Sequence, residues 1–163
     1  MNIEKKTGTD TSLRLSDPAL LRMQCRIGAQ WCDADNGATV DVRNPATGEC
    51  IGMVPDMGAA ETKRAIDAAA RSLPAWSART AGERAQLLRA LNDAMLANRE
   101  DLAVMLTAEG GKPLAEARGE IGYSASFLEW FAEEGKRLYG DVIPGHQADK
   151  RIVVTRQPVG VVA

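Results

Sequence analysis

The side chains that could carry out covalent chemistry are few and widely spaced in the 163-residue sequence. The three cysteines, Cys25, Cys32 and Cys50, fall in or beside segments that the residue pattern predicts to be strands. A nucleophilic cysteine needs an electropositive setting and an adjacent base, and none of these three strand cysteines is predicted to act in that role. An odd cysteine count without a scaffold spacing favours idle thiols in a reducing compartment over a disulfide framework.

Metal binding and phosphate binding find equally little support. The single histidine, His146, lies in a predicted loop, where a solvated side chain is expected, and no ligand at metal-binding spacing accompanies it. Gly111-Lys112 is like the end of a phosphate-binding loop, but Pro113 follows where Ser or Thr is required. No catalytic residue and no cofactor-binding residue is therefore predicted in this chain.

The overall composition limits the classes of partner. The formal net charge is -2 and the charged residues are mixed in sign, so no basic stripe for nucleic acid or an anionic membrane is predicted. No apolar run has the length of a membrane span, and the polar N-terminus lacks the apolar region of a signal peptide. A cytoplasmic location is expected. Aromatic residues make up only 4% of the chain, which suits packed helices better than a β-sandwich.

The first part of the chain is predicted to form a small antiparallel hairpin system. A loose arm over residues 1–14 is followed by a short helix opened by Ser16-Asp17-Pro18. The alternation of Cys25, Ile27, Ala29 and Trp31 indicates one half-buried strand. Turn signals and alternating apolar residues predict the rest: a turn at 33–37, a strand around Val40 and Val42, a turn at 44–48, and a strand over 50–54.

Helical periodicity then predicts three helices. The first starts near Ala59 and ends near Pro74, and the second opens with a Thr80–Glu83 capping box and has a break near Asn98. Gly111 suits a left-handed helix end, and Pro113 suits the first turn of the third helix, which runs to about Leu138. Its predicted buried stripe consists of Ala117, Ile121, Ala125, Leu128 and Phe131, and most of its glutamates (Glu116, Glu120, Glu129, Glu133 and Glu134) are expected to be solvated.

The end of the sequence predicts strands. A turn-rich segment over 140–145 leads into two apolar runs on either side of Gln157-Pro158. The second run, Val159 to Ala163, is typical of a parallel strand that is buried on both faces. Such a strand needs a crossover and a partner strand, so we expect the sequence to be interrupted inside a larger α/β domain.

The order of the motifs carries more information than any single motif. Asn44-Pro45-Ala46-Thr47-Gly48-Glu49 is followed by Glu109-Gly110-Gly111-Lys112-Pro113, then by Tyr139-Gly140-Asp141-Val142-Ile143-Pro144 and by Arg156-Gln157-Pro158-Val159-Gly160. This series resembles the N-terminal segment of the NAD(P)-dependent aldehyde dehydrogenases. Residues 127–137 and 145–151 are most similar to the succinate-semialdehyde branch of that family.

The resemblance implies an α/β fold class: the incomplete N-terminal part of the aldehyde dehydrogenase fold, with a small β-hairpin, three helices, an oligomerisation strand and the first strand of a Rossmann-type sheet. Four segments are expected: an arm and short helix (1–24), the N-terminal portion of the NAD(P)-binding domain (25–140), the oligomerisation arm strand (141–157), and the first strand of a truncated dinucleotide-binding core (158–163).

The resemblance also implies an activity, the oxidation of an aldehyde such as succinate semialdehyde with NAD or NADP. In the family a cysteine thiolate attacks the aldehyde, hydride passes to the nicotinamide, and a glutamate activates the water that releases the acid. Because these groups belong to the part of the family that follows Ala163, we expect this chain alone to bind neither cofactor and to be inactive. Partners would be a small aldehyde and further copies, joined through the 151–157 strand.

Two weaker site assignments follow from the same resemblance. The acidic residue before Gly-Gly-Lys-Pro, Glu109, would hold a monovalent cation with the backbone carbonyl of Val42, although a solvent-facing helix end explains Glu109 equally well. One face of the third helix would border the substrate tunnel through Glu120, Ser124 and Phe127, although core packing explains Phe127 equally well. A non-catalytic helical module that associates through its terminal strands is the alternative function.

Overall fold

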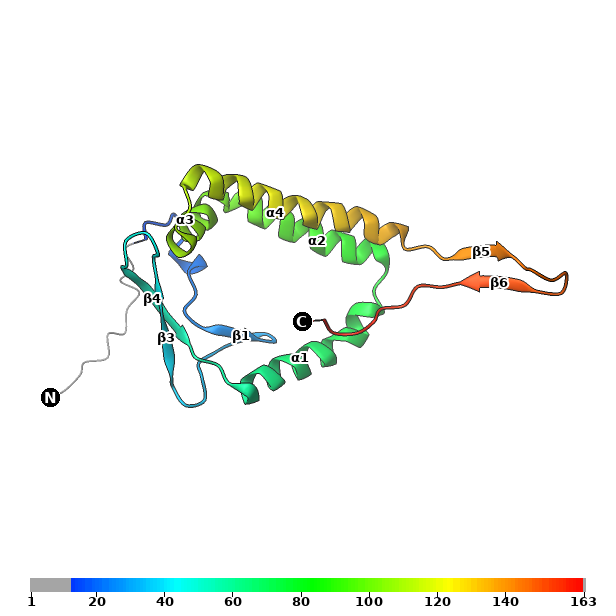
Figure 1. Cartoon of the computed structure of the whole chain (residues 1–163), viewed down its shortest axis with the longest axis horizontal. Helices are drawn as coiled ribbons and strands as arrows, with labels where there is room; N and C mark the ends of the chain where they lie inside the picture. The colour runs from blue at the N-terminus through cyan, green and yellow to red at the C-terminus, as the bar shows by residue number, and fades with distance from the viewer. Residues whose placement is uncertain (1–12, 163) are drawn as a thin grey trace. The chain divides into compact units, whose positions relative to one another are not determined.

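The computed structural model describes residues 13–162. Its contacts divide the chain into two compact units. The hairpin unit comprises the described residues up to Gly58 together with Asn98–Ile121, and the helical unit comprises Ala59–Ala97 and the described residues from Gly122 onward. Figure 1 shows the elements along the chain. Most of the arm predicted for residues 1–14 lies outside the described residues.

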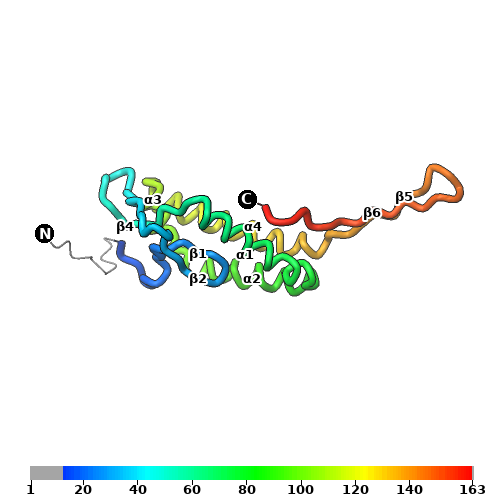
Figure 2. Tube along the Cα trace, turned by 90° about the horizontal axis from the view of Figure 1, so that it is seen from below, coloured from blue at the N-terminus to red at the C-terminus, as the bar shows by residue number. Residues whose placement is uncertain are grey.

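The hairpin unit begins with a short 3-10 turn and a tight hairpin. Asp17 caps η1 (Pro18–Leu20) by accepting from the Ala19 amide at 2.9 Å, so the predicted helix start is correct although the helix is a single turn. The hairpin consists of β1 (Cys25–Ile27) and β2 (Gln30–Cys32), which lie side by side in Figure 2.

The prediction of one continuous strand from Cys25 to Trp31 is wrong. Gly28 has a φ of 60°, whereas Ala29, like every described residue other than glycine, has a negative φ. With Ile27 opposite Gln30, Gly28-Ala29 forms a two-residue type II′ turn. The apolar alternation continues through this turn, because Ile27 and Ala29 are two residues apart on either side of the glycine. Periodicity alone therefore does not reveal that the chain reverses.

The second hairpin confirms the sequence interpretation. β3 (Thr39–Arg43) pairs in antiparallel fashion with β4 (Cys50–Pro55), and Val42 lies opposite Gly52. The connecting loop closes through the Gly48 amide, which donates to the Asn44 carbonyl at 2.8 Å. This loop is one residue longer than the type I turn that the proline predicted, and a register shift after Val42 accommodates it.

The glycine pair before Lys112 ends a helix as predicted. α3 (Arg99–Gly110) is closed by Gly111, whose φ is 71° and whose amide donates to the Thr107 carbonyl at 2.9 Å. α4 (Leu114–Glu134) starts directly after Pro113, whose carbonyl accepts from two amides of the first turn. The predicted extension to Leu138 is present as a 3-10 turn, η2 (Gly135–Arg137).

The helical unit starts with two helices that the sequence placed well. α1 (Ala59–Ser77) continues three residues past Pro74, where the prediction ended it, because the Pro74 carbonyl still accepts from the Ala78 amide at 3.0 Å. α2 (Ala81–Ala97) opens with the predicted capping box: the Thr80 amide donates to the Glu83 carboxylate at 2.7 Å, and the Glu83 amide donates to the Thr80 hydroxyl at 3.3 Å.

The segment 140–145, predicted as a turn, is a strand. β5 (Asp141–Pro144) pairs in antiparallel fashion with β6 (Arg151–Val154). A Cβ atom on Gly140 or Gly145 would collide with a backbone carbonyl across the hairpin, that of Val154 or Lys150 respectively. These glycines allow the two strands to approach, whereas the prediction placed them in a turn.

The predicted strand from Val159 to Ala163 is not formed in the described residues. Residues 155–162 have no regular structure, and Ala163 lies outside the description. A parallel strand exists only against a hydrogen-bonded neighbour, and no such neighbour is present in the described chain. Val159 is 94% exposed.

Among the described residues, the buried apolar side chains are seven alanines and one isoleucine. They are Ala34, Ile51, Ala85, Ala103, Ala108, Ala117, Ala125 and Ala132. On α4 the predicted stripe is buried at Ala117 and Ala125 but not at Phe131, which is 57% exposed, while the adjacent Ala132 is fully buried. Alanines permit close helix contacts, whereas many large apolar side chains, such as Phe131 and Trp130, are exposed among the described residues.

Candidate functional site

The predicted tunnel residue Glu120 has an ionic partner that the sequence analysis did not identify. The Lys112 ammonium donates to the Glu120 carboxylate within the hairpin unit. This hydrogen bond raises the pKa of Lys112 above its ordinary value. The turn at Gly111-Lys112-Pro113 thus positions the Glu120 carboxylate through an ion pair with Lys112.

The other two predicted tunnel residues follow Glu120 on α4 at one-turn and two-turn spacing. Ser124 is exposed, and Phe127 is 45% exposed. The Phe127 ring packs edge-on against Tyr123, with 4.8 Å between the ring centroids. The structure therefore presents Ser124 and Phe127 on the surface of the helix within the described residues.

A bidentate ion pair fixes the corner between α3 and α4. Arg118 donates to the two carboxylate oxygens of Glu100 at 2.6 and 2.8 Å, and Arg99 donates to the Arg118 carbonyl at 2.8 Å. The pKa of Glu100 is lowered mainly by the hydrogen bond from Arg118. These contacts orient the first turns of the helix that carries the predicted tunnel residues.

Asp101 links α3 to the segment that precedes η1. Its carboxylate accepts from the Ser16 and Asp17 amides, both at 2.8 Å, and the residue is buried. These two backbone hydrogen bonds lower the pKa of Asp101. This contact was not predicted, because 84 or more positions separate the partners and the only local signal is an acidic residue in a first helical turn.

The residues predicted to hold a monovalent cation lie in contacting elements. Glu109 is exposed in the last turn of α3, Val42 is half-buried on β3, and α3 contacts β3. Among residues 13–162, no group of three or more His, Cys, Asp or Glu residues is arranged to hold a metal ion. A site formed by one carboxylate and backbone carbonyls would not need such a group, so the cation site stays a prediction.

The predicted oligomerisation strand is one arm of an exposed hairpin. β6 covers Arg151–Val154, whereas Thr155–Gln157 is irregular. Val142 of β5 and Val153 of β6 are opposite each other and are 78% and 65% exposed. Apolar side chains and a two-stranded sheet with free edges give this hairpin the chemistry of a strand-pairing surface.

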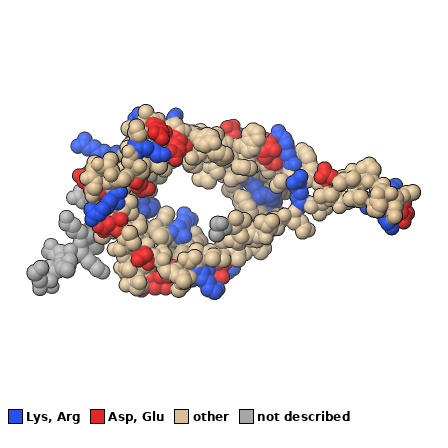
Figure 3. Space-filling view, in the orientation of Figure 1, with Lys and Arg blue, Asp and Glu red and all other residues tan. Residues whose placement is uncertain are grey.

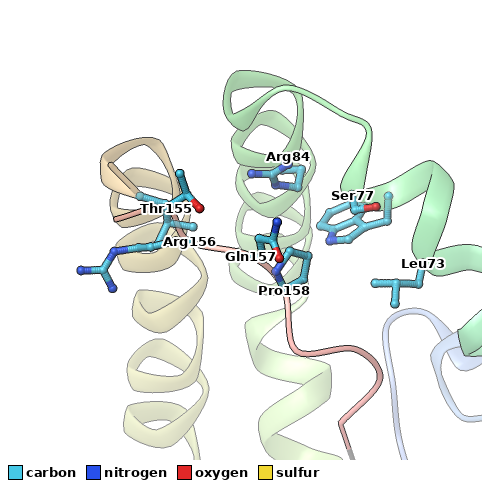
Figure 4. A pocket seen from close by; sticks show the side chains of 9 residues that line it. Leu73, Ser77, Arg84, Thr155, Arg156, Gln157 and Pro158 are labelled. Atoms are coloured by element: carbon cyan, nitrogen blue, oxygen red, sulfur yellow. The ribbon is translucent and has the colours of Figure 1, made fainter. Parts of the chain in front are cut away.

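A cavity of about 720 Å³ in the helical unit was not anticipated from the sequence. In Figure 4, Gln157 and Pro158 lie below Arg84 of α2, with Ser77 of α1 to their right, while Arg156 points away from α1. Arg156 is held there by its Nε, which donates to the Tyr139 carbonyl at 3.1 Å. The complete lining is Leu73, Trp76, Ser77, Arg84, Leu138, Thr155, Arg156, Gln157 and Pro158, and it contains no acid or thiol for catalysis.

Charges are dispersed over the surface shown in Figure 3, where cationic and anionic side chains alternate without a stripe of one sign. At the tip of the β5–β6 hairpin, for instance, Lys150 pairs with Asp149 at 3.1 Å. Among the described residues, none of the helices combines the length and the apolar character that a bilayer crossing requires.

Comparison with known proteins decides the family. The model of the aldehyde dehydrogenase family matches residues 31–163. The chain belongs to the aldehyde dehydrogenase family.

Relatives in this family are highly similar. A glutarate-semialdehyde dehydrogenase of Pseudomonas aeruginosa is 62% identical over 151 residues, which are 93% of this chain and 31% of that protein. The NADP(+) succinate-semialdehyde dehydrogenase of Escherichia coli is 60% identical over 151 residues, which are again 93% of this chain and 31% of that protein. The crystal structure of succinate-semialdehyde dehydrogenase from Burkholderia pseudomallei matches with a TM-score of 0.87 at 57% identity, covering 90% of this chain and 30% of that one.

These matches confirm the family and the fold class, the N-terminal part of the aldehyde dehydrogenase fold. The chain spans about 31% of the length of the curated relatives it matches. The predicted segment boundaries and the roles of Glu109, Val42, Glu120, Ser124 and Phe127 are not tested by these similarities, and they remain predictions.

Proposed function

We propose that this chain is one part of an NAD(P)-dependent dehydrogenase that oxidises a short aldehyde with a carboxylate at its far end. The observation that carries the proposal is the identity of 60% or more to relatives named for succinate and glutarate semialdehyde. These two aldehydes have the same functional groups and differ by one methylene. The products would be the corresponding dicarboxylic acids, with hydride transferred to the nicotinamide.

Within such an enzyme the chain acts as a scaffold rather than as the source of the reacting groups. We assign no catalytic residue to it, and we expect neither NAD nor NADP to bind it alone. Glu120, Ser124 and Phe127 are proposed to border the substrate tunnel, and the exposure of Ser124 and Phe127 supports that role. Glu109 and the Val42 carbonyl are proposed cation ligands, supported by the contact between α3 and β3.

Self-association is proposed through the 151–157 segment. The exposed valines of the β5–β6 hairpin and its free edges support this role. A cytoplasmic location is retained as a prediction. Family membership favours the dehydrogenase over a non-catalytic helical module.

The experiment is a chimera in which this chain replaces the matching 31% of the E. coli relative. The steady-state formation of NADPH is compared for succinate semialdehyde, glutarate semialdehyde and butanal, which lacks the carboxylate. We expect turnover with both semialdehydes and a kcat/KM for butanal that is at least about tenfold lower. Butanal would leave the polar groups that bind the substrate carboxylate without a partner. A folded chimera that prefers butanal would contradict the proposed substrate class, and the parent enzyme serves as the control.

A further inference from the structure

The hairpin of β1 and β2 places two cysteines opposite each other. Cys25 and Cys32 are Cα partners in its antiparallel register. Beyond them, Gln24 Nε2 lies 3.1 Å from both carboxylate oxygens of Asp33, which continues the same register by one position. The two chains therefore remain adjacent on both sides of the cysteine pair.

The two cysteine side chains share one face of the hairpin. Residues directly opposite in an antiparallel pair project to the same side, and the strand pleat directs Arg26 and Trp31 to the other side. There the Arg26 guanidinium lies 5.5 Å from the centroid of the Trp31 ring. Both cysteines are free thiols and are half-buried, so a small reagent can reach them without unfolding a core.

The expected separation is close to that of a disulfide. Ile27 and Gln30 close the two-residue turn, so Cys25 and Cys32, two positions further on, form a hydrogen-bonded pair. The Cα atoms of such a pair are about 5.5 Å apart, within the range of about 4.4 to 6.8 Å that disulfides span. Their Cβ atoms are about 4.5 to 5.5 Å apart, whereas a disulfide needs about 3.5 to 4.5 Å. Closure thus requires an approach of up to about 2 Å, which a sheet with only two strands in the described chain can accommodate.

We propose that Cys25 and Cys32 form a reversible thiol–disulfide site that exchanges with low-molecular-weight disulfides of the glutathione type. One cysteine thiolate attacks a sulfur of the small disulfide, which releases one small thiol and leaves a mixed disulfide on the protein. The second cysteine thiolate attacks the protein sulfur of that mixed disulfide and releases the second small thiol. Two protein thiols are oxidised and one small disulfide is reduced to two thiols.

The third cysteine, Cys50, can compete with Cys25 and Cys32 for the same small disulfide and so provides an internal control. Cys50 is exposed on β4, which belongs to a different two-stranded sheet from β1 and β2. Its thiol lies 3.3 Å from the Gly52 carbonyl. A reaction governed only by exposure would therefore involve Cys50, whereas the proposed reaction depends on the register between Cys25 and Cys32.

The test equilibrates the chain in reduced and oxidised glutathione, quenches it by alkylation, and maps the tryptic peptides. Trypsin cleaves after Arg26, so the Cys25–Cys32 bond joins peptide 23–26 to peptide 27–43, while Cys50 lies in peptide 44–63. Each of the three pairings therefore has its own mass. The same equilibrium in urea gives the effective concentration of the two thiols in the unfolded chain, and Cys50→Ser is the matched control.

Preorganisation by the hairpin predicts an effective concentration for the Cys25–Cys32 pair that is at least about tenfold higher in the folded chain than in urea. The Cys50→Ser variant is expected to give the same value as the parent chain. An effective concentration in the folded chain equal to or below the value in urea would overturn the proposal. So would a folded chain in which bonds to Cys50 predominate.

Discussion

Replacing Gly111 by alanine should destabilise the hairpin unit markedly. Gly111 has a φ of 71°, and a Cβ atom there would lie 2.8 Å from Cγ of Pro45. The left-handed conformation costs about 1 to 2 kcal/mol for a residue with a Cβ. Overpacking of this kind adds about 1 to 3 kcal/mol. The sum is about 2 to 5 kcal/mol, a large share of the stability of a small domain.

Gly110 provides a matched control for this substitution. It is the last residue of α3, and a Cβ atom there would meet only Lys112 Cε at an ordinary 3.7 Å. Gly110→Ala should therefore be neutral or stabilising by up to about 1 kcal/mol, because alanine is the better helix former. Urea unfolding followed by far-ultraviolet circular dichroism compares the two variants. Equal stabilities of Gly110→Ala and Gly111→Ala would contradict the conformational and steric constraint at Gly111.

Three further predictions concern the cap, the buried carboxylate and the tunnel face. Thr80→Ala removes the capping box and should cost about 1 kcal/mol in urea unfolding, while Ser72→Ala, which removes only a hydroxyl bonded within α1, should stay within about 0.5 kcal/mol. The pKa of Asp101 is lower in the folded chain than its ordinary value of 3.8. The ionised carboxylate therefore contributes its full stabilisation above pH 3.8, and this stabilisation is lost as the pH falls through the pKa of the folded state. Asp101→Asn should therefore be less stable than the parent at neutral pH, and the difference should shrink below about pH 4; a pH-independent difference would contradict this. In the chimera, Ser124→Ala should raise the KM for the semialdehyde about fivefold through the loss of about 1 kcal/mol of hydrogen bonding, whereas Ser126→Ala, on the other side of α4, should leave KM unchanged.

The features that the sequence predicted correctly are governed by neighbouring residues. Thr80 and Glu83 are three positions apart, and their capping box is present as expected. Gly111 closes α3 in the left-handed conformation because a residue without a Cβ is required there. The β3–β4 register follows from alternating residues joined by a short loop. In each case the deciding interaction lies within a few positions.

The features that the sequence could not supply depend on distant contacts or on ambiguous glycines. The Asp101 carboxylate accepts hydrogen bonds from amides that are 84 and 85 positions away, so no local sequence pattern predicts this contact. Gly28 reverses the chain, whereas Gly140 lets two strands approach, and the sequence gives no sign of which role each glycine has. The pairing of Lys112 with Glu120 was missed because glutamates on a helix are usually solvated.

The proposed function predicts that this chain can take the place of the matching segment of a dehydrogenase relative. The most direct test mixes the purified chain with the purified remainder of the E. coli relative, that is, the protein without the matching 31%. Reduction of NADP by succinate semialdehyde should appear on mixing and saturate near equimolar chain, while each piece alone stays inactive. The matching piece of the E. coli protein serves as the positive control. If that piece restores turnover and this chain, folded and soluble, does not, the account is contradicted.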